Sequence, residues 1–221
     1  MNKKLSLTAL AASLLAACGG GSGSSNSGTP VSTLTLSGTA AVGAPIVGGT
    51  VNTKCAAGPA VLPVSTGTDG SWTLTATGQT LPCAVQVSGG TINGAANTGQ
   101  YESIATGAGH INLTPVTDLV VANLIASDFN TLNGASLAGI SAANIAAAID
   151  RVRTALGLTT LNTINPLTDT FTPTSGNRMD DTLSALRTAM AVAGVTQDDL
   201  VNAARTALGS AFDAPPGLTA A

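Results

Sequence analysis

The stretch Asn112-Leu113-Thr114-Pro115-Val116-Thr117-Asp118 marks the point at which the hydrophobic pattern of this chain changes. Before it, apolar residues tend to recur at every second position, as in strands, whereas after it they recur with the spacing of a helix. Thr114 is a suitable helix N-cap, Pro115 fits a first helical position that needs no amide donor, and Asp118 suits the positive end of the helix dipole. We therefore expect an α+β fold in which strands precede helices.

Residues 34–113, upstream of this point, contain short apolar and hydroxyl-rich runs separated by Gly and Pro. In Trp72-Thr73-Leu74 and Val85-Gln86-Val87 the apolar residues alternate with polar ones, so one face of each strand should point into a core. The pattern predicts an N-terminal antiparallel β-sandwich of about seven strands. The expected strands are residues 34–40, 46–54, 60–65, 71–76, 84–88, 101–105 and 110–113.

Residues 114–213 are predicted to form a small α-helical bundle, followed by a C-terminal tail over residues 214–221. The first helix, starting after Thr114, is apolar on most sides and should be central and buried. Helix-start and helix-stop signals delimit three more helices, at Ser141, Gly157, Gly194 and Thr196.

Two pairs of similar segments occur within this helical half. Arg153-Thr154-Ala155-Leu156-Gly157 recurs as Arg205-Thr206-Ala207-Leu208-Gly209, and the segment 114–118 is echoed by Asn165-Pro166-Leu167-Thr168-Asp169. Either an internal duplication or the common chemistry of helix ends explains them.

The N-terminal end carries a processing signal. Residues 1–17 combine two lysines with an apolar run too short to span a bilayer, which predicts a signal peptide. Leu15-Ala16-Ala17-Cys18 resembles the lipobox of bacterial lipoproteins, whose cysteine receives fatty acyl chains such as palmitate and becomes the N-terminus. Gly19 resembles the residue found there in lipoproteins sorted to the outer membrane of Gram-negative cells. The resemblance implies anchoring through Cys18, with residues 18–33 as a flexible tether.

This assignment bears on the three cysteines of the chain. If Cys18 is the anchor, Cys55 and Cys83 remain to form a disulfide in an oxidising compartment. The alternative is two reduced, buried thiols. A zinc site is not expected, because two thiols and the single histidine do not form a ligand cluster at the usual spacing.

Two further segments resemble the carboxypeptidase-regulatory-like domain, a prealbumin-like or Ig-like β-sandwich of bacterial surface proteins. One runs from Gly38-Thr39-Ala40 to Val51, and the other is Thr68-Asp69-Gly70 followed by Trp72-Thr73-Leu74. The segments 165–171 and 176–183 resemble uncharacterised proteobacterial lipoproteins that join such a sandwich to a helical domain. The resemblance implies a structural or binding module.

Charge and motif content exclude several functions. Once residues 1–17 are removed, six basic residues remain against eleven acidic ones, and they are not clustered, so nucleic-acid binding is not expected. His110 is expected at a strand edge rather than as a general base, and there is no Gly-x-Ser-x-Gly motif. The adjacent acids Asp180-Asp181 and Asp198-Asp199 are explained by helix dipoles. We predict no catalytic residues, no cofactor and no metal.

Trp72 and Tyr101 are the only large amphipathic rings of the chain. Packing in the core is expected for both, with ligand stacking as the alternative; for Tyr101, Glu102 and Gln100 favour an exposed position.

The sequence thus predicts a lipid-anchored outer-membrane protein, facing the periplasm or the exterior, that acts as a non-catalytic binding or structural module for an unidentified envelope or extracellular ligand. One alternative is an envelope hydrolase acting on polysaccharide through residues such as Asp118 or Asp169. Another is a self-assembling surface protein, because only Lys54, Asp69 and Glu102 carry charge between residues 34 and 113.

Overall fold

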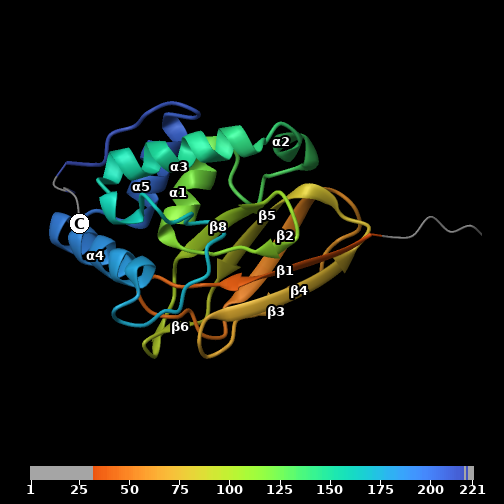
Figure 1. The fold of residues 1–221 in the computed structure, drawn as a ribbon, viewed down its shortest axis with the longest axis horizontal. Coiled ribbons are helices and arrows are strands. Elements are labelled where there is room, and N and C mark those ends of the chain that lie inside the picture. Colours follow the sequence, from red (N-terminus) through yellow and green to blue (C-terminus); the bar gives the residue numbers. More distant parts are fainter. Residues whose placement is uncertain (1–31, 217, 219–221) are drawn as a thin grey trace, which may run out of the picture. The chain divides into compact units, whose positions relative to one another are not determined.

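The structure, a computed structural model, describes residues 32–216 and 218. These residues belong to one compact unit in which nine strands are followed by five α-helices and one 3-10 helix (Figure 1). The predicted α+β class and the order of strands before helices are confirmed. The expected leader, Cys18 and the expected tether up to residue 31 lie outside the described residues. Thr33, the last residue expected in the tether, belongs to the first strand.

The first sheet has the strand order β4-β1-β9 and contains β1 (Thr33–Thr39), β4 (Ser71–Thr77) and β9 (Gly109–His110). β1 and β4 are antiparallel. Side chains alternate along each strand, so Leu36 of β1 and Trp72 of β4 are buried while their neighbours Thr35 and Thr73 are exposed. β9 pairs with β1 in parallel, so the prediction of purely antiparallel sheets is wrong at this edge. The reason is topological, because the chain passes through the other sheet before it returns alongside β1.

The second sheet has the order β3-β2-β5-β8, with β2 (Thr50–Ala57), β3 (Val64–Ser65), β5 (Thr80–Ser88) and β8 (Gln100–Ala105). All of its neighbouring strands are antiparallel. Val85 and Val87 share a hydrophobic cluster with Leu36 and Trp72 of the first sheet. Ala84, on the other face of β5, belongs to a second cluster formed mainly by helical residues.

Several strand boundaries differ from the expected ones. The segment 46–54 becomes a strand only at Thr50, because Gly48 has a left-handed φ of 66° and the Thr66 hydroxyl holds residues 46–49 in a turn. The segment 60–65 is a strand only over Val64–Ser65, because Pro59 and Pro63 have no N–H to donate to a ladder.

A short hairpin, β6 (Thr91–Ile92) and β7 (Ala95–Ala96), was not expected. Asn93 and Gly94 connect its strands with φ values of 51° and 81°, the two positive angles that a type I′ turn requires. The Asn-Gly signal was therefore present in the sequence, but the strands are too short to show alternation. The seven expected strands correspond to β1–β5, β8 and β9, with β9 covering only Gly109–His110, and the two strands of this hairpin bring the described strands to nine.

The helices are α1 (Pro115–Leu124), α2 (Gly134–Ala138), α3 (Ala142–Leu156), the 3-10 helix η1 (Thr159–Leu161), α4 (Arg178–Ala193) and α5 (Gln197–Thr206). The expected caps are confirmed at Thr114, Ser141 and Thr196, and Gly157 and Gly194 end their helices in the left-handed conformation. α2 was not expected, because its five residues show no helical periodicity.

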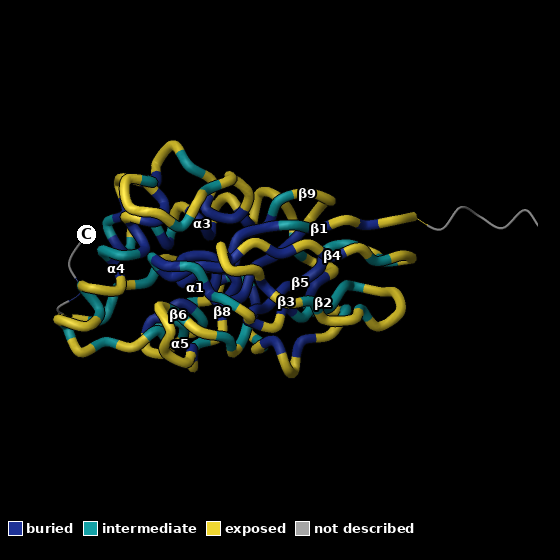
Figure 2. The backbone as a smooth tube through the Cα atoms, turned by 90° about the horizontal axis from the view of Figure 1, so that it is seen from below, coloured by how far each residue is buried: buried dark blue, intermediate teal, exposed yellow. Residues whose placement is uncertain are grey.

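α1 lies at the centre of the helical part. Thr114 and Thr117 form a reciprocal capping box, and the residues from Pro115 to Asn123 are all buried. α1 packs against β8 on one side and against α3 and α5 on others, while α2 covers β2 and β5. In Figure 2 the buried part of the chain runs through the middle, where α1 lies, and exposed residues form the rim.

The segment 165–169, which echoes the start of α1 in sequence, folds differently. Residues 166–168 form a turn, and the Asp169 carboxylate accepts a hydrogen bond from the Asn165 N–H at 2.9 Å. The likeness between the two segments is thus not accompanied by the same local structure. Within the described residues, no helix is long and apolar enough to cross a membrane.

Candidate functional site

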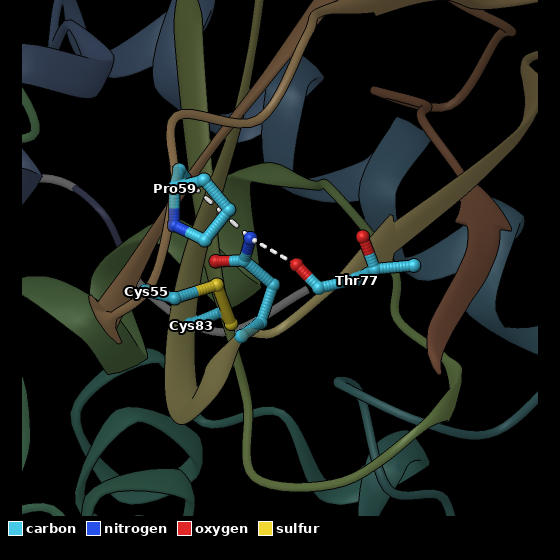
Figure 3. Close-up of a disulfide and its surroundings, with 5 residues drawn as sticks. Cys55, Pro59, Thr77 and Cys83 are labelled. Carbon is cyan, nitrogen blue, oxygen red and sulfur yellow. Dashed lines mark hydrogen bonds between the residues drawn. A yellow bond between two sulfur atoms is a disulfide. The ribbon is translucent and has the colours of Figure 1, made fainter. Parts of the chain in front are cut away.

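The predicted disulfide between Cys55 and Cys83 is confirmed. The two residues are directly paired neighbours on β2 and β5, with Cα atoms 3.9 Å apart. Near the bridge, the Gln79 amide donates to the carbonyls of Pro59 and Thr77 (Figure 3). These bonds tie the loop after β2, which contains Pro59, to the end of β4. The bridge uses two of the three cysteines of the chain, and Cys18 lies outside the described residues.

A groove of about 370 Å³ lies between α3 and the turn from β8 to β9, and we call it the α3 groove. Its apolar surface comes largely from isoleucines and alanines of α3, including Ile145 and Ala146. Its polar groups are the hydroxyls of Thr106 and Thr168, the Asn165 amide and the ring of His110. The volume falls in the range of small-molecule sites.

His110 is half-buried on the edge strand β9, in agreement with the strand-edge position expected for it. Its Nε2 lies 2.7 Å from Oδ1 of the fully buried Asn112. The Asn112 amide nitrogen donates to the carbonyls of Pro166 and Asp169, which fixes the direction of the amide. Because Oδ1 can only accept, Nε2 must carry the proton, and Nδ1 of the neutral ring is then a hydrogen-bond acceptor.

A second depression, of about 300 Å³, continues the α3 groove along α3 and shares Ala146, Ile149 and Asn165 with it. Its charged residues, Asp150 and Arg153, form an ion pair of 3.0 Å with each other. Among the described residues that line the α3 groove itself, none carries a formal charge when His110 is neutral.

A second candidate site is a cluster of buried polar groups between β8, α1 and α5. The Asp118 carboxylate on α1 accepts hydrogen bonds from the Glu102 N–H at 3.2 Å and from the Gln197 amide at 2.9 Å. The Glu102 carboxylate accepts from the Phe129 N–H and the Gln86 amide through Oε1. Its other oxygen, Oε2, is buried and has no hydrogen-bond partner in the described part of the chain.

Burial dominates the electrostatics of this cluster. Removal from water raises the pKa of Asp118 from 3.8 to about 8; the negative charge of Glu102 adds to this, and the Gln197 hydrogen bond and the positive charge of Arg205 oppose it. Burial also raises the pKa of Glu102. Buried carboxyls of this kind occur in catalytic sites, but also in structural networks that join elements. Because these hydrogen bonds connect a strand, two helices and a loop, the cluster fits the structural role.

The two acids considered for a hydrolase lie in different networks. Asp118 belongs to the buried cluster, whereas Asp169 is exposed and bonds to Asn165 in the turn that borders the α3 groove. The paired acids 180–181 and 198–199 occupy the first turns of α4 and α5, as expected from the helix dipole.

Trp72 and Tyr101 are 3% and 8% exposed, so both rings pack in the core as predicted. The expectation that Glu102 makes the region of Tyr101 exposed is wrong, because Glu102 is itself only 6% exposed. α1 and the Phe129 loop cover the face of β8 that carries Glu102. Burial raises the pKa of the Tyr101 hydroxyl to about 12, and the negative charge of Asp118 contributes to the rise.

Sequence reasoning missed both Asn112 as the partner of His110 and the cluster around Glu102. His110 and Asn112 are only two residues apart, but the Asn112 amide is oriented by the distant carbonyls of Pro166 and Asp169. The contacts around Glu102 likewise join different elements, so no local signal identifies either arrangement. In the described ranges, no group of three or more His, Cys, Asp or Glu side chains is placed to hold a metal ion.

Comparison of the chain with family models, with curated proteins and with solved structures finds no match.

Proposed function

We propose that this chain is a lipid-anchored protein of the Gram-negative outer membrane, whose folded body is a non-catalytic binding or structural module. The observation that carries the proposal is the use of the cysteines. The Cys55–Cys83 bridge leaves Cys18 as the one cysteine of the chain outside the disulfide, and Cys18 ends the lipobox-like sequence. A formed disulfide also suits the oxidising environment of the cell envelope.

The packing of two sheets supports a carboxypeptidase-regulatory-like sandwich as the proposed architecture of the body. The three-stranded and four-stranded sheets contribute their apolar faces to one hydrophobic cluster, as two packed sheets do. The parallel β1–β9 pair departs from an all-antiparallel sandwich. We propose this type of sandwich, with the helices packed on its larger sheet, as the architecture of the module.

The α3 groove supports binding over a purely structural role. It is a concave site with an apolar surface and a few polar groups, and it contains a histidine whose ring is oriented by a buried amide. A ligand that binds a ring already held in place pays a smaller entropic cost than one that must first order the ring.

The anchor is tested by expressing the full chain in a Gram-negative host with a labelled fatty acid. We expect label on the wild type and on Cys83→Ser, but none on Cys18→Ser, which should leave the membrane fraction. Gly19→Asp should keep the label and move the protein from the outer to the inner membrane. Labelled or membrane-bound Cys18→Ser protein would refute the proposal.

A further inference from the structure

We propose that the α3 groove binds a neutral, hydroxyl-bearing small ligand, namely a sugar residue, and that Nδ1 of His110 accepts a hydrogen bond from one ligand hydroxyl. The inference rests on the proposed role of the body as a binding module, and it adds the chemical class of the ligand. Three features of the groove carry it.

The first feature is the direction of the hydrogen-bonding groups. The contact between Nε2 and Asn112 fixes the tautomer of the neutral His110 ring, and in that ring Nδ1 is an acceptor with no partner in the part of the chain that the structure describes. A ligand that engages Nδ1 must therefore supply a donor, as a hydroxyl does. The hydroxyls of Thr106 and Thr168 both donate and accept, which matches the dual character of sugar hydroxyls.

The second feature is charge. The described residues lining the α3 groove include no Asp, Glu, Lys or Arg. Of the charged residues beside it, Asp150 and Arg153 neutralise each other, and the Asp169 carboxylate in the bordering turn accepts a hydrogen bond from the Asn165 N–H. An anionic or cationic ligand would leave water for a surface that offers no counter-charge, which costs free energy. Charge complementarity therefore selects a neutral ligand.

The third feature is the combination of size and surface. A groove of about 370 Å³ accommodates a ligand of one or two sugar rings. The exposed side chains of Ala142 and Ala146, together with the largely buried Ile145, supply apolar surface for the C–H face of such a ring. The adjoining depression, which shares Ala146 and Asn165 with the groove, offers room for a further unit of a chain.

The test is an NMR titration of the isotope-labelled full chain, with its disulfide intact, in detergent micelles. The probes are glucose, galactose, N-acetylglucosamine and maltose, with glucuronate as the anionic comparison. We expect at least one neutral sugar to shift the amide signals of Gly107, Ala146 and Thr168 in a saturable way. Glucuronate should bind more weakly than the neutral sugar.

Two substitutions at His110 separate the two ring nitrogens. His110→Gln places an amide near the position of Nε2, so it keeps a donor for Asn112 but loses the Nδ1 acceptor; His110→Asn places its amide near the position of Nδ1 and loses the bond to Asn112. Loss of one hydrogen bond to the ligand should weaken binding by about five- to tenfold in His110→Gln. His110→Asn should bind more tightly than His110→Gln.

A matched pair on α3 tests the location. Ala146 lines the α3 groove and Ala147 does not, and both are exposed, so neither change disturbs the core. Ala146→Met should abolish the sugar-dependent shifts, and Ala147→Met should leave them unchanged. No saturable shift with any of the neutral sugars, binding that survives Ala146→Met, or tighter binding of glucuronate would each overturn the inference. The acylation of Cys18 is measured independently, so a failed titration beside a labelled anchor refutes the ligand class alone.

Discussion

Replacement of Asp118 by Asn should remove most of the pH dependence of stability of this protein. Asp118 is 6% exposed, and burial raises its pKa from 3.8 to about 8. A carboxyl with a raised pKa in the folded state stabilises the fold while it is protonated. Its contribution is complete below the unfolded pKa, near 4, and is lost as the pH rises through the folded pKa, near 8.

The size of the effect follows from the shift. A difference of about four pKa units corresponds to about 5 kcal/mol at 1.36 kcal/mol per unit, distributed between about pH 4 and pH 8. The raised pKa of Glu102 acts with the same sign, and the positive charge of Arg205 opposes both. An asparagine at this position is neutral at every pH and can still accept from the Glu102 N–H. Its new N–H group can donate to the unpartnered Oε1 of Gln197 if that amide turns over, with loss of the hydrogen bond that the Gln197 amide donates to the Pro115 carbonyl.

The assay is denaturant unfolding of the full chain from about pH 5 to pH 9, with the free energy of unfolding plotted against pH. We expect the wild type to lose stability steadily as the pH rises, and Asp118→Asn to give a much flatter line that lies above the wild type at the alkaline end. Asp198→Asn, which changes an exposed acid in the first turn of α5, should retain the wild-type slope. A slope in Asp118→Asn equal to that of the wild type would refute the assignment.

Three further outcomes test the fold. Thr114→Ala removes the half of the buried capping box in which the Thr114 hydroxyl accepts from the Thr117 N–H, and keeps the half in which the residue 114 N–H donates to the Thr117 hydroxyl. It should lower the free energy of unfolding by about 1–2 kcal/mol; an unchanged midpoint would contradict the role of the cap. Reduction of the Cys55–Cys83 bridge opens a loop with a sequence separation of 28 and should cost about 3 kcal/mol, measured by unfolding with and without reductant, whereas equal midpoints would contradict it. Gly38→Ala places a Cβ against the backbone carbonyl of Ile111 and should sharply lower the melting temperature. Gly139→Ala is the control, because nothing lies within 4 Å of a Cβ at that position. Similar melting temperatures for the two variants would show that the close approach at Gly38 is absent.

The caps of the long helices were predictable because their chemistry is local. Thr114, Ser141 and Thr196 each accept from an N–H three residues ahead, so the signal lies within one turn of sequence. The same holds for Gly157, whose left-handed conformation ends α3 as expected. Trp72 was also placed correctly in the core, since alternation along a single strand is enough to identify its buried face.

The strand pattern was less complete because pairing depends on partners far away in the chain. The parallel contact between β1 and β9 depends on a crossing between two sheets, which no window of sequence contains. The hairpin at Asn93-Gly94 had a clear turn signal, but its two-residue strands are held in part by a bridge from Val47 to Thr91.

By itself, the sequence determined the α+β class, the order of strands before helices and the caps of the long helices. Together with the lipobox resemblance of Cys18, it predicted the pairing of Cys55 with Cys83. Only the tertiary structure decided that Glu102 is buried beside Asp118 and that Asn112 orients His110 at the α3 groove. The physical reason is range. Helix caps and strand alternation arise from interactions between residues close in the chain, whereas burial and hydrogen bonding at both sites depend on which elements pack against each other after folding.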